Sequence, residues 1–175
     1  MRLEGQNIIL RDIVLDDAER FVFWLNDPNV YKFMATRQPT LEKEKTWIES
    51  LAYKKETDIA LAIETKAGKH IGSVGLHKMH KENRNAEMGI MIGDKDYWEK
   101  GYGKDAMRVM LDYAFKELRL HRVELGVYAY NPRAIHVYES LGFKREGIKR
   151  ERTFYEGKFY DEIIMGMLAG EWLKI

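Results

Sequence analysis

The segment with the clearest chemical potential runs from Asp96 to Lys104 and reads Asp-Tyr-Trp-Glu-Lys-Gly-Tyr-Gly-Lys. Glycines at positions 101 and 103 let consecutive backbone N–H groups turn into one concavity, and a helix that follows adds the positive end of its dipole. Lys100 adds positive charge beside them. The segment could therefore bind a phosphate or a pyrophosphate, although the same glycines also suit an ordinary tight entry into a helix.

Two known phosphate-binding patterns can be compared with this segment. A P-loop requires G-x-x-x-x-G-K-[ST], but Gly103-Lys104 is followed by Asp105 and the first glycine of the pattern is missing. The dinucleotide pattern G-x-G-x-x-G/A is met by Gly101, Gly103 and Ala106. It should follow a strand directly, within repeated strand–helix–strand units, and neither condition holds here. A dinucleotide-binding oxidoreductase is therefore only the alternative to the function inferred below.

A second candidate segment runs from Asn131 to Phe143. Asn131 suits a helix N-cap, Pro132 the first helical position, and Gly142 a left-handed residue at the C-terminal end. Asn131 and Tyr138 stand seven residues apart, which is about two helical turns, so they share one helix face. Because a tyrosine on an apolar face is most often a core residue, a chemical role for Tyr138 needs further support.

One carboxylate residue stands two positions from a glycine on the predicted strand 85–92. Strand alternation places Glu87, Gly89 and Met91 on the same face. Glu87 is therefore a candidate catalytic base, with an ordinary solvated carboxylate as the open alternative.

The composition excludes several classes of protein. The 29 Lys and Arg residues against 28 Asp and Glu residues give a net charge of +1. A dedicated nucleic-acid-binding protein would be much more basic, so this class is excluded. The longest apolar run, residues 21–25, is far short of the roughly 20 residues that span a membrane, and Met1-Arg2-Leu3-Glu4 is unlike a secretory signal, so we expect a cytoplasmic protein. The absence of cysteine excludes a thiolate zinc site, and the pair His77 and His80 lacks further ligands, so no metal is expected.

Hydrophobic periodicity predicts one α+β domain over residues 1–175. Strands are predicted at residues 8–12, 59–63, 71–79, 85–92, 122–127, 144–153 and 158–167. Helices are predicted at residues 16–26, 40–55, 104–117 and 132–141, with a short tail helix at Trp172. Asp27-Pro28 would end the first helix, and turns at Ala67-Gly68 and Glu156-Gly157 would close two hairpins.

The order of these motifs resembles the GNAT superfamily of acetyl-CoA-dependent N-acetyltransferases. Its signature [Q/R]-x-x-G-x-[G/A] is met at Gly101 and Gly103 and departs at Trp98, where Gln or Arg is usual. Its second pattern, N-x-x-[A/S]-x-x-x-Y-x-x-x-G-[F/Y], is met in full by Asn131, Ala134, Tyr138, Gly142 and Phe143. The resemblance implies a mixed, mostly antiparallel sheet of about six to seven strands, flanked by helices, with a splayed acetyl-CoA cleft.

The two ends of the chain extend the likeness. They look like the branch that acetylates ribosomal-protein N-termini, polyamines and amino sugars. The residues concerned are Leu10-Arg11 with Asp16, Trp24 to Pro28, Gly157 with Tyr160-Asp161, and Glu171-Trp172.

The resemblance also implies roles for individual residues. The pyrophosphate of acetyl-CoA would bind the loop formed by Trp98, Glu99, Lys100, Gly101, Tyr102, Gly103 and Lys104. Further cofactor contacts would come from the backbone at Met91 and Ile92, and from Asn131, Arg133 and Ala134. Tyr138 would protonate the departing thiolate, because a phenol with a reference pKa near 10 stays protonated at neutral pH. Glu87 would take the proton of the acceptor's ammonium group, directly or through water.

The acceptor amine is less constrained. The segment Ala35-Thr36-Arg37-Gln38-Pro39 lacks the acidic residues that would attract a polycation such as spermidine. A peptide or protein N-terminus is the first candidate, and a small-molecule amine such as an amino sugar or an aminoglycoside is the second. Aromatic segments at 23–37 and 154–160 would form the acceptor wall. A catalytically silent acetyl-CoA-binding module is a further alternative, and a free sheet edge would permit a homodimer.

Overall fold

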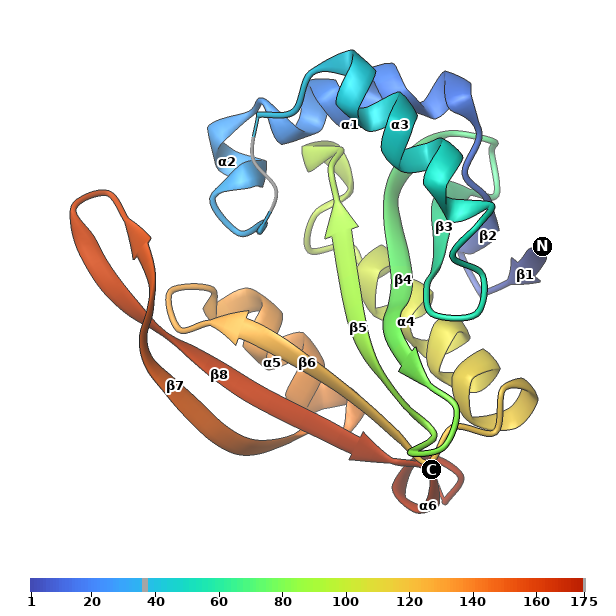
Figure 1. Ribbon diagram of the computed structural model, residues 1–175, viewed down its shortest axis with the longest axis vertical. Coiled ribbons are helices and arrows are strands. Elements are labelled where there is room, and N and C mark those ends of the chain that lie inside the picture. Colours follow the sequence, from blue (N-terminus) through green and yellow to red (C-terminus); the bar gives the residue numbers. More distant parts are fainter. Residues whose placement is uncertain (36–37, 175) are drawn as a thin grey trace. The chain divides into compact units, whose positions relative to one another are not determined.

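The computed structural model describes residues 1–35 and 38–174. Its helices and strands are labelled in Figure 1. Hydrogen bonds join eight strands in the order β1-β2-β3-β4-β5-β6-β8-β7. The chain forms two compact units: unit 1 comprises Met1–Met79 and Gly89–Met110, and unit 2 comprises His80–Met88 and Leu111–Ile175. Strand β5 contributes residues to both.

Unit 1 combines antiparallel strands with short helices. Its strands are β1 (Arg2–Glu4), β2 (Ile8–Asp12), β3 (Ile59–Thr65), β4 (His70–His80, all but its last residue) and the second half of β5 (Asn85–Ile92). Its helices are η1 (Leu15–Asp17), α1 (Ala18–Leu25), α2 (Pro28–Tyr31), α3 (Leu41–Leu51), η2 (Lys95–Tyr97) and most of α4 (Tyr102–Asp112). Strands β1 to β4 pair antiparallel in sequence order, which is the arrangement that short hairpin connections favour.

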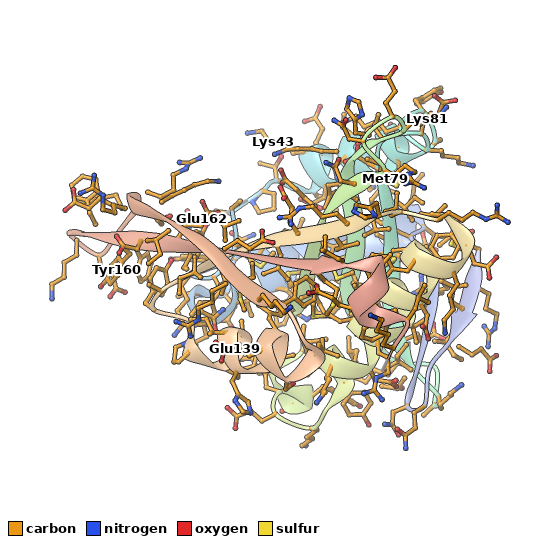
Figure 2. The ribbon with its side chains drawn as sticks, turned by 90° about the horizontal axis from the view of Figure 1, so that it is seen from below. Lys43, Met79, Lys81, Glu139, Tyr160 and Glu162 are labelled. Atoms are coloured by element: carbon orange, nitrogen blue, oxygen red, sulfur yellow. The ribbon has the colours of Figure 1, made fainter. Side chains whose placement is uncertain are left out.

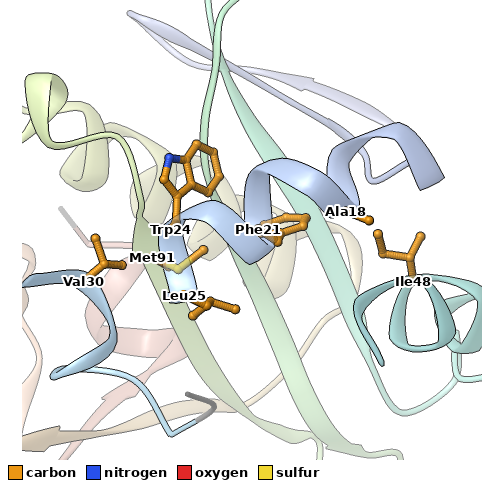
Figure 3. Packing of buried hydrophobic residues seen from close by; sticks show 7 residues of the cluster. All are labelled: Ala18, Phe21, Trp24, Leu25, Val30, Ile48 and Met91. Carbon is orange, nitrogen blue, oxygen red and sulfur yellow. The ribbon is translucent and has the colours of Figure 1, made fainter. Parts of the chain in front are cut away.

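A buried apolar cluster fixes α1 over the end of β5. Helical spacing brings the apolar residues of α1 to one face, where they pack with residues of α2, α3 and β5 (Figure 3). The cluster consists of Ala18, Phe21, Trp24, Leu25, Val30, Ile48 and Met91. A Cβ atom at Gly93 would lie 2.1 Å from the Trp24 indole, so only glycine lets that ring lie against the end of the strand. Met91 therefore marks the face of β5 that α1 covers.

Unit 2 contains the end of the chain. Its elements are the first residues of β5, the π-helical turn η3 (Tyr113–Glu117), β6 (Arg122–Tyr128), α5 (Pro132–Leu141), β7 (Lys144–Tyr155), β8 (Lys158–Leu168) and α6 (Ala169–Trp172). Strand β8 pairs antiparallel with β6 and with β7, whereas β5 pairs in parallel with β6 at residues 85–87. This mixed sheet confirms the predicted α+β class, and it is not the repeated parallel arrangement of a dinucleotide-binding oxidoreductase.

The main differences from the predicted elements lie near the N-terminus. The sheet has eight strands because Arg2–Glu4 pairs with β2, and the N-terminal ammonium group forms an ion pair with Asp12. Three residues are too few to show a period, so this strand was not predictable from alternation. Asp27-Pro28 follows the end of α1 as predicted, but it also starts α2, where Asp27 accepts a hydrogen bond from the Asn29 N–H at 2.9 Å.

The remaining differences are shifts of helix ends. Helix α3 ends at Leu51 rather than near Lys55, and α4 begins at Tyr102, two residues before the predicted start. The predicted turns are confirmed, with positive φ at Gly68, Glu156 and Gly157. No helix among the described residues has the length and apolar character needed to cross a membrane. The splayed cleft stays a prediction.

Candidate active site

The predicted phosphate-binding loop lies in unit 1, between β5 and α4. Its backbone turns sharply, with positive φ at Glu99 (60°) and Gly101 (84°). Helix α4 then begins, and the Asp105 N–H donates to the Gly101 carbonyl at 3.0 Å. The first turn of a helix leaves its N–H groups without partners inside the helix. With the helix dipole, the N–H groups that follow Gly101 suit a pyrophosphate.

Trp98 connects this loop to the preceding strand. Its indole Nε1 donates a hydrogen bond to the Ile92 carbonyl at 2.7 Å, and its ring packs against the apolar cluster of α1. The rings of Tyr97 and Tyr102 meet edge to face across the loop, 5.1 Å apart. The departure from the Gln or Arg of the family pattern therefore brings a contact that fixes the loop, which the pattern alone did not indicate.

Ion pairs anchor the loop from its N-terminal side. Lys69 lies 2.8 Å from Asp94, and Lys95 lies 2.5 Å from Asp27. The pair with Lys95 lowers the pKa of Asp27, and the pair with Asp94 raises the pKa of Lys69. The short turn η2 is thereby tied to β4 and to the start of α2.

A second anchor lies at the C-terminal side of the loop. The Asp105 carboxylate of α4 accepts the backbone N–H groups of Gln6 at 3.2 Å and Asn7 at 2.6 Å. A Cβ atom at Gly5 would lie 2.9 Å from the same carboxylate. The start of α4 is thus held against the turn between β1 and β2.

The main chain of β5 differs between the two positions predicted to pair with the cofactor. The Met91 carbonyl lies against β4, where a Cβ atom at Gly72 would come within 2.0 Å of it. The Ile92 carbonyl instead meets the indole of Trp98. Because successive peptide groups of a strand point to opposite edges, Ile92 presents its main chain to the edge away from β4. Backbone pairing of acetyl-CoA at Met91 and Ile92 stays a prediction, and of the two residues Ile92 has its main chain at the edge away from β4.

The Asn131 motif lies in unit 2 and folds as predicted. Asn131 Oδ1 caps α5 by accepting the Ala134 N–H at 3.2 Å, and Arg133 lies half-buried in the first turn. At the other end Gly142 has a φ of 100°. The Tyr138 side chain is half-buried, and burial raises its pKa to about 12. Its phenol therefore stays protonated at neutral pH, as a proton donor must.

Glu87 lies in the short parallel ladder of unit 2. It is half-buried and opposite Glu124 of β6. Glu124 accepts two hydrogen bonds from Arg122, at 2.8 and 3.0 Å, and the same guanidinium binds Glu146. Arg122 thus balances the charge of Glu124, and the role of Glu87 as base stays a prediction.

An aromatic cluster lies at the hairpin side of unit 2. The ring of Tyr130 stacks on Tyr128 at 5.3 Å and on Tyr155 at 5.6 Å, and meets Tyr160 edge to face at 4.7 Å. Tyr160 lies on β8, two residues before Glu162, and both are labelled in Figure 2. The segment 154–160 is therefore as aromatic as the predicted acceptor wall requires.

The other half of the predicted acceptor wall is described only in part. Phe23 of α1 is 74% exposed. Thr36 and Arg37, on which the argument against spermidine partly depended, lie outside the described residues.

One pair of side chains was missed by the sequence analysis. His77 Nδ1 of β4 lies 3.1 Å from Asp58 Oδ1, at the start of β3. His80, the other histidine of the close pair in the sequence, accepts the Asn83 N–H at 3.2 Å. Within residues 1–35 and 38–174, no group of three or more His, Cys, Asp or Glu side chains is arranged to hold a metal ion. The hairpin register could have revealed the pair, since the turn at Ala67-Gly68 brings residues 58 and 77 opposite each other.

Comparisons with known proteins agree with this geometry. A family model described as an acetyltransferase (GNAT) domain matches residues 7–144. The chain is 28% identical over 174 residues to "Uncharacterized N-acetyltransferase p20" of Bacillus licheniformis, covering 97% of both chains. It is 34% identical over 105 residues to "Putative ribosomal N-acetyltransferase YdaF" of Bacillus subtilis, covering 60% of this chain and 57% of that one.

A solved structure extends the match to the whole fold. The structure of spermidine N-acetyltransferase from Vibrio cholerae, in complex with CoA and spermine, covers 97% of this chain and 99% of its own. It superimposes with a TM-score of 0.90 at 25% identity. The glycine loop, the Asn131 motif, the mixed sheet and the family match lead to one assignment. The chain belongs to the GNAT acetyltransferase family and is an acyltransferase with acetyl-CoA as its co-substrate.

Proposed function

We propose that residues 1–175 act as one N-acetyltransferase domain that transfers the acetyl group of acetyl-CoA to a primary amine. The observation that carries this proposal is the loop with positive φ at Glu99 and Gly101, which ends at the first turn of α4. The family match supports it, because residues 7–144 include this loop and the whole of α5. A cytoplasmic location and a homodimer remain predictions from the sequence.

The proposed reaction is a direct attack of the amine on the thioester. The amine nitrogen forms a bond to the carbonyl carbon, the tetrahedral intermediate collapses, and the C–S bond breaks. Tyr138 donates its phenolic proton to the departing thiolate, and its raised pKa keeps that proton in place at neutral pH until the thiolate leaves. The loop from Trp98 to Lys104 holds the pyrophosphate, and Ile92 pairs with the pantetheine. Asn131, Arg133 and Ala134 contribute further cofactor contacts.

The proposed acceptor is the N-terminus of a peptide or protein. Its support is the name of the YdaF relative, the near-neutral charge of the chain, and the aromatic residues of segment 154–160. The second candidate is a small-molecule amine, which the name of the spermidine-acetylating neighbour favours. Aromatic faces suit both, because they stack on peptide groups and attract ammonium groups.

A comparison of acceptors tests this proposal. Pentapeptides that begin with Ser or Ala, spermidine and glucosamine are each incubated with acetyl-CoA, and release of the CoA thiol gives kcat/KM for each amine. The proposal expects the best peptide to exceed both small amines at least tenfold, with one acetyl group on its N-terminus by mass spectrometry. A preference for spermidine or glucosamine would replace the peptide acceptor with the second candidate.

A further inference from the structure

The pair of Asp58 and His77 has the geometry of an oriented imidazole. The Asp58 carboxylate lies 3.1 Å from His77 Nδ1, and its second oxygen accepts the Thr57 hydroxyl at 2.7 Å. Burial alone would raise the pKa of Asp58, but the hydrogen bonds from Thr57 and His77 outweigh burial and lower it. Asp58 is therefore a carboxylate at neutral pH. It holds the proton of His77 on Nδ1 and leaves Nε2 as an acceptor.

A β-bulge directly follows His77 in β4. Leu76 of β4 pairs with Ile59 of β3. Further along, the Met79 N–H donates to the Thr57 carbonyl at 2.8 Å, so that three residues on β4 correspond to two residues on the facing strand. Strand β4 therefore contains one extra residue, and Lys78 takes it up with a φ of 50°. Bulges of this kind re-aim side chains and often lie beside active sites. Met79, at the end of the bulge, is labelled in Figure 2.

Two glycines clear the space around Nε2. A Cβ atom at Gly75 would lie 3.1 Å from His77 Nε2, and a Cβ atom at Gly89 of β5 would lie 3.5 Å from it. The ring thus covers the bare backbone of two neighbouring strands, and 39% of its side-chain surface remains exposed. Neither glycine carries a side chain that would cover Nε2.

The location on β5 connects this imidazole to the cofactor. Gly89 shares a strand face with Met91, which α1 covers, whereas Ile92 faces α4, since its side chain lies 3.5 Å from a Cβ atom at Gly103. Acetyl-CoA held at the loop and at Ile92 extends back along β5. Gly89 lies three residues before Ile92, about 10 Å along the strand. In the proposed complex the thioester end would reach the level of Gly89, against which His77 Nε2 lies.

We propose that His77, oriented by Asp58, is the general base that takes the proton from the acceptor's ammonium group. The N–H bond of the ammonium breaks and its proton moves to His77 Nε2. The freed lone pair forms the C–N bond, and the C–S bond breaks as the thiolate leaves with the proton from Tyr138. The second proton of the amine nitrogen then passes to the tyrosinate, which restores the phenol and leaves a neutral amide. This inference rests on the proposed function and assigns to His77 the role that the sequence analysis gave to Glu87. Asp58 acts through His77 and is a positioning residue.

The charged groups around His77 determine which variants can serve as controls for its role. Asp58, the residue before β3, faces the imidazole, and Lys54 acts electrostatically on Asp58. Glu87 shares its strand face with Gly89 on β5. The pair of Asp58 and His77 is partly exposed to solvent and contributes little to stability, so variants of His77 should remain folded. His80→Asn provides the matched control, because His80 is a nearby exposed histidine outside this pair.

The first experiment requires no knowledge of the acceptor. Bromoacetyl-CoA places an electrophilic carbon at the position of the acetyl methyl group. His77 Nε2 should displace its bromide and form a C–N bond, and peptide mapping should locate the adduct at His77. Acetyl-CoA should protect, His77→Asn should abolish the adduct, and His80→Asn should not. If the analogue raises the melting temperature but leaves His77 unlabelled, the inference fails while the family function stands. If it does not bind, the proposed function fails.

The second experiment uses the best amine from the acceptor comparison. His77→Asn keeps a donor for Asp58 but has no base at Nε2, so kcat/KM for the amine should fall about 100-fold at neutral pH, while the KM for acetyl-CoA stays within about twofold. The deficit should shrink at high pH, where the amine is already neutral. Asp58→Asn should lower kcat/KM for the amine about tenfold while the KM for acetyl-CoA stays within about twofold, because His77 loses the carboxylate that orients it. The pH–rate profile is recorded for each variant. An acidic limb unchanged in His77→Asn but lost in Glu87→Gln would overturn the inference.

Discussion

The indole Nε1 of Trp98 donates a hydrogen bond to the main-chain carbonyl of Ile92 at 2.7 Å. This contact joins the phosphate-binding loop to the last residue of the strand that precedes it. The strand positions the pantetheine and the loop positions the pyrophosphate in the proposed complex. The Trp98–Ile92 contact therefore sets the distance between two parts of one cofactor site.

Replacing Trp98 by Phe should weaken acetyl-CoA binding without unfolding the protein. The substitution keeps an aromatic ring in the apolar cluster but removes the donor to the Ile92 carbonyl. A lost hydrogen bond of this kind costs about 1 kcal/mol, so the Kd for acetyl-CoA should rise roughly fivefold. Isothermal titration calorimetry measures it. Trp172→Phe is the control, since it removes an indole hydrogen bond to Asp112 in unit 2. An unchanged Kd in Trp98→Phe would separate this contact from cofactor binding.

Gly101→Ala should impair the same loop through its backbone. A Cβ atom at this position meets nothing within 4 Å, but φ is 84°, where L-residues are strained by about 1 to 2 kcal/mol. Relief of the strain would turn the loop N–H groups away, so we expect the Kd for acetyl-CoA to rise about tenfold. Gly170→Ala adds a methyl group in equally open space with an ordinary φ and should bind as the wild type does. Equal affinities for the two variants would contradict the role of this turn.

Tyr138→Phe tests the proposed acid. Loss of the phenolic proton should lower kcat about 100-fold while the Kd for acetyl-CoA stays within about twofold. Stopped-flow detection of the released thiol gives the rate. Tyr113→Phe is the matched control, because Tyr113 is another half-buried tyrosine with a raised pKa but lies outside the Asn131 motif. A kcat equal to that of the wild type would remove Tyr138 as the acid.

The raised pKa of Tyr138 predicts the basic side of the pH–rate profile. An acid must be protonated to act, and activity falls as pH rises through its pKa. Burial raises this pKa to about 12, so kcat at saturating acetyl-CoA should stay level up to about pH 10. Circular dichroism over the same range checks that the fold persists. A basic limb near pH 9 that disappears in Tyr138→Phe would show that the phenol ionises too early for this account.

Asp17 should make the fold acid-sensitive. Its buried carboxylate accepts two hydrogen bonds from Arg11, at 2.8 and 2.9 Å. Burial alone would raise its pKa, but the hydrogen bonds from Arg11 and other donors hold it well below the usual range. Since the folded-state pKa is lowered, the stabilisation is present above the unfolded value of about 4 and is lost as pH falls below it.

Asp17→Asn should therefore destabilise the protein at neutral pH. Removing one partner of a buried pair costs about 3 kcal/mol, equivalent to a fall in Tm of roughly 6 to 12 °C. The difference from the wild type should narrow between about pH 4 and pH 2 in urea unfolding. Asp16→Asn, at an exposed neighbouring position, should change stability by less than about 0.5 kcal/mol. A gap between the Asp17 variant and the wild type that stays constant down to pH 2 would contradict the assignment.

The sequence predicted those parts of the fold and site that local chemistry determines. Asn131, Pro132 and Gly142 cap α5 as expected, because capping depends on a few neighbouring residues. The strand Arg2–Glu4 was too short to show an alternating pattern. Helix α2 was not predicted because Asp27, which follows the end of α1, also caps a new helix.

The parts that were missed depend on register and on long-range contacts. The pairing of Asp58 with His77 depends on the alignment of β3 with β4, in which Ile59 pairs with Leu76. The bond from Trp98 to Ile92 requires the course of the loop in space. The spacing of residue types identified the glycine loop and the Asn131 motif, but it does not give the course of a loop in space, and it gives the Asp58–His77 pair only once the hairpin register is known.

Amine-dependent release of the CoA thiol tests the central claim most directly. Wild-type protein is mixed with acetyl-CoA and increasing concentrations of a Ser- or Ala-starting peptide or of a small amine. The account predicts release that saturates with amine, at one acetylated amine per thiol. An acetyl-CoA-induced rise in Tm, without amine-dependent release for any acceptor, would contradict it and indicate a catalytically silent acetyl-CoA-binding module.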